Sequence, residues 1–523
     1  MSIYGTEIRC YLFFWQILSV RRGEATMTEK EGEIGSGTPD QKSLKASRGK
    51  LSRREFAQAS VIVGAAAAIP SVLRAEPQSD AEPAAKVPAT KIPASTRTGS
   101  ASSGSTEWRE GTTIPSEYYY EVEHYKKDER YIGDYFWLLA DHVSRIPETG
   151  DFFVFKYGLG ESVIVVRDES GDIRALNNVC RHRGSRLCRH DEDPRPNDER
   201  LSVRQLGESG NAQVFRCPYH AWLYDLDGSL IDAYEVHDDF DMAANGLIPC
   251  HVRVEQGHIF LNFSRAEKPP EFGAYFEYSF DEVGDSHRLA DLKIASRQYY
   301  PINANWKLAI ENFLECYHCG PSHKSLVTTH NWDYTLTSSQ KKRQTKKISA
   351  QLGTDPDEAQ EEAQGMGSGG MGAGGMGSGA GLFEGELNPG FVTGSLDGKP
   401  LAPLLPGISD WTHKTKIATT GYSTGYWQAY DDHVAVARFT PRGPEFTDCE
   451  IFWLVHPDAV EGKDYVAKNL MALWDITIRE DIWIVENNHL GVKSGAYRPA
   501  RYSKNEGDPS DFINWYMNDV VQT

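Results

Sequence analysis

Two groups of metal-binding side chains stand out in this chain of 523 residues. The first pairs Cys180 with His182, as C-x-H, and Cys217 with His220, as C-x-x-H. Two thiolates and two imidazoles so spaced can hold a [2Fe–2S] cluster with both imidazoles on one iron, a Rieske-type centre. Structural zinc also accepts two Cys and two His, but zinc sites usually group like ligands. Because each segment here supplies one of each kind, the spacing favours the iron–sulfur cluster.

The second group follows a segment whose pattern becomes helical at Asn305. Glu311, Glu315 and His318 fall at i, i+4 and i+7, so a continuous helix would place them on one face. The sequence Gly-Pro at residues 320–321 predicts a break after this helix, which would let His323 fold back towards His318. Two imidazoles with a nearby carboxylate can bind the iron of a non-haem Fe(II) oxygenase, which would activate O2.

A third ligand, a carboxylate, must come from elsewhere in the chain, and Asp481 is the candidate. A long helix is predicted over residues 465–489, and Asp481 lies on its apolar stripe. The other members of that stripe are Trp474, Ile478 and Val485. A buried, unpaired carboxylate would be costly there, and a metal ion would compensate that cost. Glu480 is the alternative ligand.

Strand and turn patterns surround the first group of ligands. Residues 162–166 and 258–263 have the composition of strands, and residues 168–172 and 225–228 have the composition of hairpin turns. We therefore expect a small all-β domain over residues 118–250, with the cluster ligands on two hairpin loops.

Residues 251–523 are expected to form a second domain of the α+β class. Strand-like segments at 434–439 and 451–455 precede the long helix that carries Asp481. A polar stretch that ends in a Gly- and Met-rich tract interrupts this domain over residues 339–382. Such a composition cannot bury a core, so a disordered insert is predicted there.

The first 76 residues have the features of a twin-arginine export signal. Arg53 and Arg54 precede a short apolar run over residues 61–69, with small residues beyond it. The run is too short for an ordinary membrane span, so no stable span is expected. The sequence thus predicts export to the periplasm, followed by a flexible linker over residues 77–117. A buried N-terminal helix in a cytoplasmic protein is the alternative.

Charge and cysteine content exclude two classes of protein. The formal net charge of −19 and the pI near 5.3 argue against a nucleic-acid partner, since phosphate contacts need a basic face. Eight Cys in a chain of this length do not indicate a disulfide framework. Cys316 and Cys319 form a C-x-x-C around His318, and we interpret both as packing residues near a metal.

The chain resembles the catalytic α subunits of Rieske non-haem iron ring-hydroxylating oxygenases over residues 135–516. The resemblance is carried by four segments with the sequences NVCRHRG at 178–184, CPYHAW at 217–222, NWK with ENF at 305–313, and DIWIVE at 481–486. Cys188 and His190 repeat the C-x-H spacing, but only the earlier pair is followed by Arg-Gly as in the family.

The resemblance implies a role for each matching residue. Cys180, His182, Cys217 and His220 would bind the cluster, and His318, His323 and Asp481 would bind the mononuclear Fe(II). An acidic residue three positions before the first iron-binding His, here Glu315, would bridge to a cluster His of the neighbouring subunit. Most ring-hydroxylating members have Asp at that position. Glu is similar to the branch with choline and carnitine monooxygenases and glycine-betaine demethylases.

The family also implies an architecture and partners. These are a helix-grip catalytic domain with an antiparallel sheet, a head-to-tail homotrimer, and electrons from an external NAD(P)H-dependent reductase or ferredoxin. No Gly-rich dinucleotide fingerprint follows a strand in this chain, which agrees with a separate reductase.

Three functions are consistent with these residues. A monooxygenase that hydroxylates or demethylates a small quaternary ammonium compound fits Glu315 and an aromatic cage for a cation. The candidate cage residues are Tyr422, Tyr426, Trp427 and Tyr430. The alternatives are an aromatic-ring-hydroxylating dioxygenase and an exported Rieske electron-transfer subunit, which would need no mononuclear iron.

Overall fold

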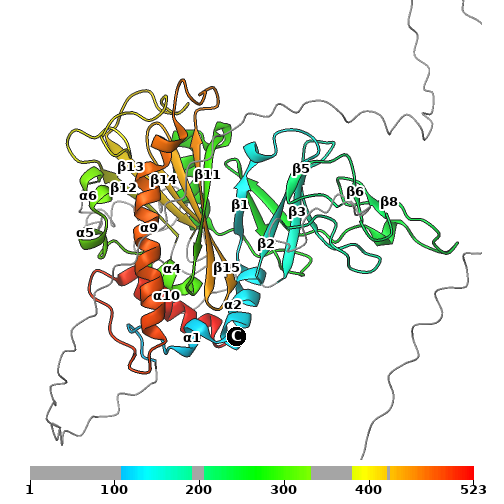
Figure 1. Ribbon diagram of the computed structural model, residues 1–523, viewed down its shortest axis with the longest axis horizontal. Helices are drawn as coiled ribbons and strands as arrows, with labels where there is room; N and C mark the ends of the chain where they lie inside the picture. The colour runs from blue at the N-terminus through cyan, green and yellow to red at the C-terminus, as the bar shows by residue number, and fades with distance from the viewer. Residues whose placement is uncertain (1–107, 159, 191–204, 331–379, 421–424) are drawn as a thin grey trace, which may run out of the picture. The chain divides into compact units, whose positions relative to one another are not determined.

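The computed structural model describes residues 108–158, 160–190, 205–330, 380–420 and 425–523 (Figure 1). The expected export signal, most of the expected linker and insert, and Tyr422 lie outside these residues. Two parts of those expectations are corrected. Residues 108–117 are not a free linker, since the Thr113 amide donates to the Ala500 carbonyl at 2.9 Å. The last residues of the expected insert begin an edge strand at Ala380.

The cluster-ligand segments belong to a small all-β unit, as predicted. One antiparallel sheet has the order β4-β3-β2-β5, and a smaller one has the order β6-β7-β8. The strands are β2 (Asp151–Tyr157), β3 (Glu161–Arg167), β4 (Ile173–Asn177), β5 (Ser209–Asn211), β6 (Phe215–Arg216), β7 (Leu223–Tyr224) and β8 (Leu230–Asp232). Alternate residues such as Phe152, Val154, Ile164 and Val166 point into one core, which also contains Cys180 and Cys217.

A three-stranded sheet with the order β1-β10-β9 adjoins this unit. It consists of β1 (Leu138–His142), β9 (His251–Glu255) and β10 (His258–Asn262). Two helices, α1 (Glu117–Tyr120) and α2 (Val122–Tyr135), precede β1. Their buried side chains, among them Tyr119 and Ile132, pack in the core that also contains residues of α4 (Trp306–Phe313) and α9 (Ala467–Val492) in the catalytic domain. Short 3-10 helices occur at Val143–Arg145, Ala243–Asn245 and Leu289–Asp291.

The catalytic domain is built on a six-stranded antiparallel sheet with the order β11-β16-β15-β14-β13-β12. The strands are β11 (Lys293–Ile302), β12 (Ala380–Glu386), β13 (Lys414–Thr420), β14 (Gly425–Ala429), β15 (Val434–Gly443) and β16 (Phe446–Val455). The long helix α9 (Ala467–Val492) packs across one face of the sheet (Figure 1). The opposite face packs with β1, β10 and α3 (Ala274–His287).

Alternation along the central strands explains why both faces are buried. In β15, Ala435, Ala437 and Phe439 face the α9 side, and Val434 and Val436 face the other. Because both faces of this strand are covered, its sequence is a nearly continuous run of apolar residues. The α+β architecture with an antiparallel sheet against the C-terminal helix agrees with the prediction.

The site-bearing segment packs against α9, and its first helix also contacts β15 and β16. It comprises α4 (Trp306–Phe313), α5 (Cys319–Ser322) and α6 (Lys324–Thr329). Asn305 caps α4 by accepting a hydrogen bond from the Lys307 amide at 3.0 Å. The fully buried Lys307 pairs with the equally buried Asp128 of α2. The chain ends with α10 (Gly507–Trp515) and a π-helical turn (Tyr516–Val520).

Among the described residues, no helix is both long enough and apolar enough to cross a membrane.

Candidate metal centres

The structure brings the four predicted cluster residues together at the tips of two loops. Cys180 and Cys217 are buried and form no disulfide bond. Burial raises the pKa of the Cys180 thiol, and the adjacent Cys217 adds to the rise. His182 and His220 are exposed, with ring centroids 4.6 Å apart. Two buried thiols below two exposed imidazoles suit a cluster whose outer iron carries both His.

Contacts with Tyr224 and Trp222 hold the ligand residues of the first loop in place. The Tyr224 hydroxyl lies 3.2 Å from Cys180 Sγ and accepts a hydrogen bond from the Arg181 amide at 3.0 Å. The His182 ring stacks on Trp222, with centroids 4.7 Å apart. Gly184 follows the first ligand pair with φ +74°, a left-handed conformation that favours glycine. This conformation explains the glycine at position 184 in the segment that follows the first C-x-H.

The second C-x-H lies in a different environment. The Cys188 side chain is fully buried, and its amide donates to Asn178 Oδ1 at 2.9 Å. Burial alone raises the pKa of the Cys188 thiol to about 12, with no contribution from another thiol. Cys180, and not Cys188, is therefore the cysteine that lies beside Cys217.

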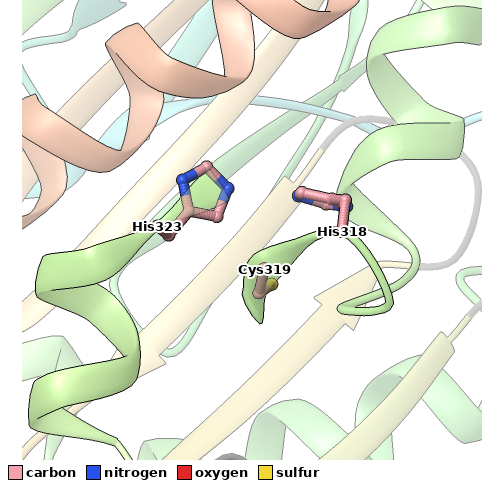
Figure 2. A group of neighbouring side chains, drawn as sticks. All are labelled: His318, Cys319 and His323. Atoms are coloured by element: carbon pink, nitrogen blue, oxygen red, sulfur yellow. The ribbon is translucent and has the colours of Figure 1, made fainter. Parts of the chain in front are cut away.

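His318, His323 and Asp481 converge in the catalytic domain. The Nε2 atoms of His318 and His323 lie 3.2 and 2.9 Å from the same oxygen, Asp481 Oδ1. The two rings are 5.1 Å apart and nearly perpendicular, and Figure 2 shows them facing each other. Two imidazole nitrogens and one carboxylate oxygen directed at a common point are the donor set of a facial triad.

The other nitrogen of each imidazole is held by a glutamate. His318 Nδ1 lies 2.6 Å from Glu315 Oε1, and His323 Nδ1 lies 2.9 Å from Glu480 Oε2. Burial by itself would lower the pKa of His318, but hydrogen bonds to Asp481 and Glu315 raise it to about 9. The pKa of His323 is likewise raised, against the effect of burial, by Asp481 and Glu480. These carboxylates orient both Nε2 atoms inward, as outer partners of metal-binding imidazoles do.

The single helix predicted from Asn305 to His318 is wrong. Helix α4 ends at Phe313, and residues 314–318 form a turn before α5. Glu315 closes this turn by accepting hydrogen bonds from the Tyr317 and His318 amides, which a helical Glu315 would not do. The predicted break at residues 320–321 is also wrong, since α5 includes them. Pro321 fits there because the first turn of a helix needs no amide donor.

The prediction that Cys316 and Cys319 are simple packing residues is also corrected. The two are joined by a disulfide, with Cα atoms 4.9 Å apart. Donor atoms of His318, Cys319 and His323 lie within 4.8 Å of one another, so Cys319 does lie near the metal-binding atoms. As a disulfide sulfur it offers no thiolate, whereas Asp481 supplies an oxygen at hydrogen-bond distance from both rings. Beside the two imidazole nitrogens, the oxidised protein therefore offers the Asp481 oxygen and no Cys319 thiolate.

An aromatic wall adjoins this set. It consists of Phe313, Tyr426 and Trp474, with Tyr426 lying 6.0 Å from Phe313 and 5.9 Å from Trp474. Burial, followed by the charge of Asp481, raises the pKa of Tyr426, whose hydroxyl donates a hydrogen bond to Gln428 Oε1 at 2.6 Å. Phe313 and Trp474 are not among the predicted cage residues. The i, i+7 spacing from Trp474 to Asp481 on the helix was the available signal.

The other predicted cage residues are distributed differently. Trp427 points to the opposite face of β14, where its indole donates to His258 Nε2 at 3.0 Å. It therefore cannot share a cage with Tyr426, because adjacent strand residues point to opposite faces. Tyr430 is fully buried, and its hydroxyl lies 2.8 Å from His330 Nε2.

One amide completes the surroundings of the iron-binding candidates. Asn312 Nδ2 lies 3.3 Å from His318 Nε2, and Asn312 Oδ1 is buried without a hydrogen-bond partner among the described residues. A buried polar atom without a partner is costly. Its position beside the convergent donors suits a site that holds a metal and further ligands.

Comparison with known proteins agrees with this geometry. Residues 136–240 match the Rieske [2Fe-2S] domain, and residues 289–522 match the ring hydroxylating alpha subunit (catalytic domain). The glycine betaine monooxygenase oxygenase subunit of Chromohalobacter salexigens is 30% identical over 412 residues, which are 78% of this chain and 86% of the relative. That of Pseudomonas aeruginosa strain UCBPP-PA14 is 32% identical, over 78% of this chain and 89% of the relative.

Solved structures share the fold. A quaternary ammonium Rieske monooxygenase aligns with a TM-score of 0.57 at 21% identity, over 79% of this chain and 95% of that one. A naphthalene 1,2-dioxygenase aligns with a TM-score of 0.52 at 20% identity, over 79% of this chain and 93% of that one. The chain belongs to the Rieske non-haem iron ring-hydroxylating oxygenase α subunits. It is an oxidoreductase with a [2Fe–2S] cluster and a mononuclear iron, and such subunits use O2 and a reductase or ferredoxin.

Proposed function

We propose that this chain is the terminal oxygenase of a system that hydroxylates or demethylates a small quaternary ammonium compound. Cys180, Cys217, His182 and His220 would hold the cluster. His318, His323 and Asp481 would hold the mononuclear iron. The observation that carries the second assignment is the convergence of two Nε2 atoms on one oxygen of Asp481.

The protein's part in the reaction is to orient these ligands and to bind the substrate. When bound, the cluster supplies single electrons and the mononuclear iron activates O2. Glu315 and Glu480 hold the imidazoles in the tautomer that directs Nε2 inward. Asn312 offers an amide to whatever occupies the position beside His318. The buried ring of Trp474 and the partly buried ring of Phe313 limit the access of water to this side of the site.

The aromatic wall supports the substrate class. A quaternary ammonium group carries no hydrogen-bond donor, so a protein recognises it through the faces of aromatic rings. Phe313, Tyr426 and Trp474 supply such rings, and the charge of Asp481 acts on the central one, Tyr426. Relatives named for glycine betaine and carnitine support the same class. The similarity to naphthalene 1,2-dioxygenase shows only a shared fold. Preference for an aromatic substrate is the competing outcome of the binding experiment below.

Ligand binding tests the substrate class. Reduced, oxygen-free enzyme is titrated with glycine betaine and with its carbon isostere 3,3-dimethylbutanoate, in which a neutral tert-butyl group replaces the trimethylammonium group, while the Fe(II) spectrum is followed. A cation–π site binds the cation about 5- to 30-fold more tightly, equivalent to about 1–2 kcal/mol. Tyr426→Leu should remove most of that difference. Tighter binding of an aromatic acid than of either compound would favour the dioxygenase.

Iron content tests the two-centre assignment. An oxygenase subunit holds three irons per chain and an electron carrier only two. His318→Ala should lose the mononuclear iron and keep the visible absorption of the cluster. Cys180→Ser should abolish that absorption. Loss of the cluster in His318→Ala would contradict the assignment of the two centres to separate ligand sets.

We also propose a head-to-tail homotrimer. The exposed imidazoles of His182 and His220 would meet Glu315 of the next copy, so electrons would cross a subunit boundary. Large apolar side chains are exposed where a second copy could cover them. Trp483 and Leu490, two turns apart on α9, have exposed fractions of 71% and 69%. Light scattering of the purified protein should give three times the mass of one chain.

Export to the periplasm is a further part of the proposal. The Arg53-Arg54 pair before a short apolar run supports it. The Cys316–Cys319 disulfide also supports it, because disulfides persist in oxidising compartments. Replacing both arginines by Lys should leave the protein in the cytoplasm. Unchanged periplasmic recovery would contradict the export signal.

A further inference from the structure

The Cys316–Cys319 disulfide lies within the turn that carries the mononuclear site. Its two half-cystines enclose Tyr317 and His318, and Cys319 is the first residue of α5. Figure 2 shows Cys319 between the two imidazoles in projection, at the start of the short helix that ends before His323. Cys319 is 4% exposed, so its sulfur faces the protein interior and not bulk water.

The distances allow Cys319 to become a ligand once the disulfide is opened. One donor atom from each of His318, Cys319 and His323 lies within 4.8 Å of the other two. In a tetrahedral zinc site, with Zn–S about 2.3 Å and Zn–N about 2.05 Å, nitrogen and sulfur are roughly 3.5 Å apart. The Cys319 sulfur and the imidazole nitrogens would thus have to move closer together by a distance on the order of 1 Å. A cysteine side chain freed from its crosslink, at the first position of a four-residue helix, can make such a movement.

The chemistry of the two oxidation states differs sharply. A disulfide sulfur is a poor ligand, so the oxidised protein offers two imidazoles and the Asp481 carboxylate, which suits Fe(II) with open positions. A thiolate is a strong, soft ligand. With Cys319 as thiolate, the same pocket offers two nitrogens, one sulfur and one oxygen, which suits tetrahedral zinc and leaves no open position for O2 or substrate.

We propose that reduction of the Cys316–Cys319 disulfide converts the iron site into a zinc site with His318, Cys319 and His323 as ligands. The disulfide thereby preserves the selectivity of the pocket for iron. Reduction adds two electrons and two protons to the S–S bond and yields two thiols, at the expense of a dithiol reductant that becomes a disulfide. Zinc binding then displaces the proton of the Cys319 thiol.

This inference rests on the mononuclear site proposed above, but not on the identity of the substrate. Its test uses two single substitutions that both remove the disulfide. Cys316→Ser leaves a free thiol at Cys319, beside the imidazoles. Cys319→Ser leaves a free thiol at Cys316 and is the matched control.

The experiment is a metal competition on the cluster-containing protein, with mononuclear Fe(II) bound and zinc added without oxygen. Cys316→Ser should release its iron at a zinc concentration on the order of tenfold lower than wild type or Cys319→Ser, since even an outer partner of a metal ligand changes affinity 10- to 100-fold. X-ray absorption at the zinc edge should show one sulfur neighbour near 2.3 Å in Cys316→Ser and none in Cys319→Ser.

Wild-type protein treated with a phosphine reductant forms a second arm, which does not depend on the folding of a variant. It should acquire the same sulfur neighbour, and the visible spectrum reports whether the cluster stays intact. Zinc with only nitrogen and oxygen neighbours in both Cys316→Ser and the reduced wild type would overturn the inference while leaving the iron site in place. Wild type that takes up no third iron would instead overturn the proposed iron site itself.

Discussion

Glu480 lies 2.9 Å from Nδ1 of His323, on the opposite side of the ring from its sequence neighbour Asp481. Two adjacent carboxylates of α9 therefore hold the two nitrogens of one imidazole. Glu480→Gln should lower the affinity of the site for Fe(II) about 10- to 100-fold, because an amide orients the ring less strongly than a carboxylate. Retention of iron against a chelator measures the effect, with the cluster spectrum unchanged.

The control for this variant is Glu486→Gln. Glu486 lies on the same helix but accepts its hydrogen bonds from Asn303. It should retain iron as wild type does. Equal retention by both variants would mean that Glu480 has no role in positioning His323.

Glu315 holds His318 in the same manner, and it would also contact the neighbouring subunit. Glu315→Gln should keep the fold and the cluster, because an amide oxygen can still accept the hydrogen bonds that close the turn, and it should hold the mononuclear iron when Fe(II) is supplied in excess. Electron delivery to the mononuclear iron should fall by about two orders of magnitude, since the charge that orients the imidazoles is lost. Rapid mixing of reduced enzyme with O2 and substrate, followed at the cluster absorption, measures this rate. Wild-type rates would leave Glu315 without a role in electron transfer.

The buried pair of Lys307 and Asp128 joins α4 to α2, and Asp128 also accepts hydrogen bonds from Trp306 at 2.9 Å and from Tyr516 at 2.8 Å. Lys307→Met leaves a buried carboxylate without its counter-ion, so the free energy of unfolding should fall by about 3–5 kcal/mol. Chemical denaturation of the catalytic domain, followed by its fluorescence, measures the loss. Adding Asp128→Leu should restore much of it, and a double variant as unstable as the single one would argue against this explanation.

Glu311 makes stability depend on pH near neutrality. Burial raises its pKa to about 7, although Tyr119 and Tyr502 donate hydrogen bonds to it at 2.9 and 2.6 Å. Between pH 4.5 and pH 7, the Glu311 carboxyl is therefore protonated in the folded protein and ionised in the unfolded chain. Its contribution to the free energy of unfolding consequently falls as the pH rises through that window. Glu311→Gln should become more stable relative to wild type from pH 5 to pH 8. Unfolding curves at several pH values test this, and a pH-independent difference would contradict it.

The sequence by itself determined the donor types and their local pairing. The C-x-H and C-x-x-H spacings place each Cys and His on one short loop, and such local geometry depends on few residues. The stripe on the C-terminal helix likewise predicted that Asp481 would face inward, and the structure places it within reach of both imidazoles. The apolar runs of β15 and β16 predicted buried strands, whereas the antiparallel pairing of the sheet was implied by the family resemblance.

Tertiary structure decided the features that depend on distant parts of the chain. His318 and Asp481 are 163 positions apart, so only the packing of α4 and α6 against α9 sets their separation. The end of α4 at Phe313 was not predictable from helical spacing, because Glu315 satisfies the amides of the following turn in place of helical carbonyls. The closure of the Cys316–Cys319 disulfide depends on that same turn. The aromatic wall needed the strand register as well, since Tyr426 and Trp427 differ by one residue and face opposite sides of the sheet.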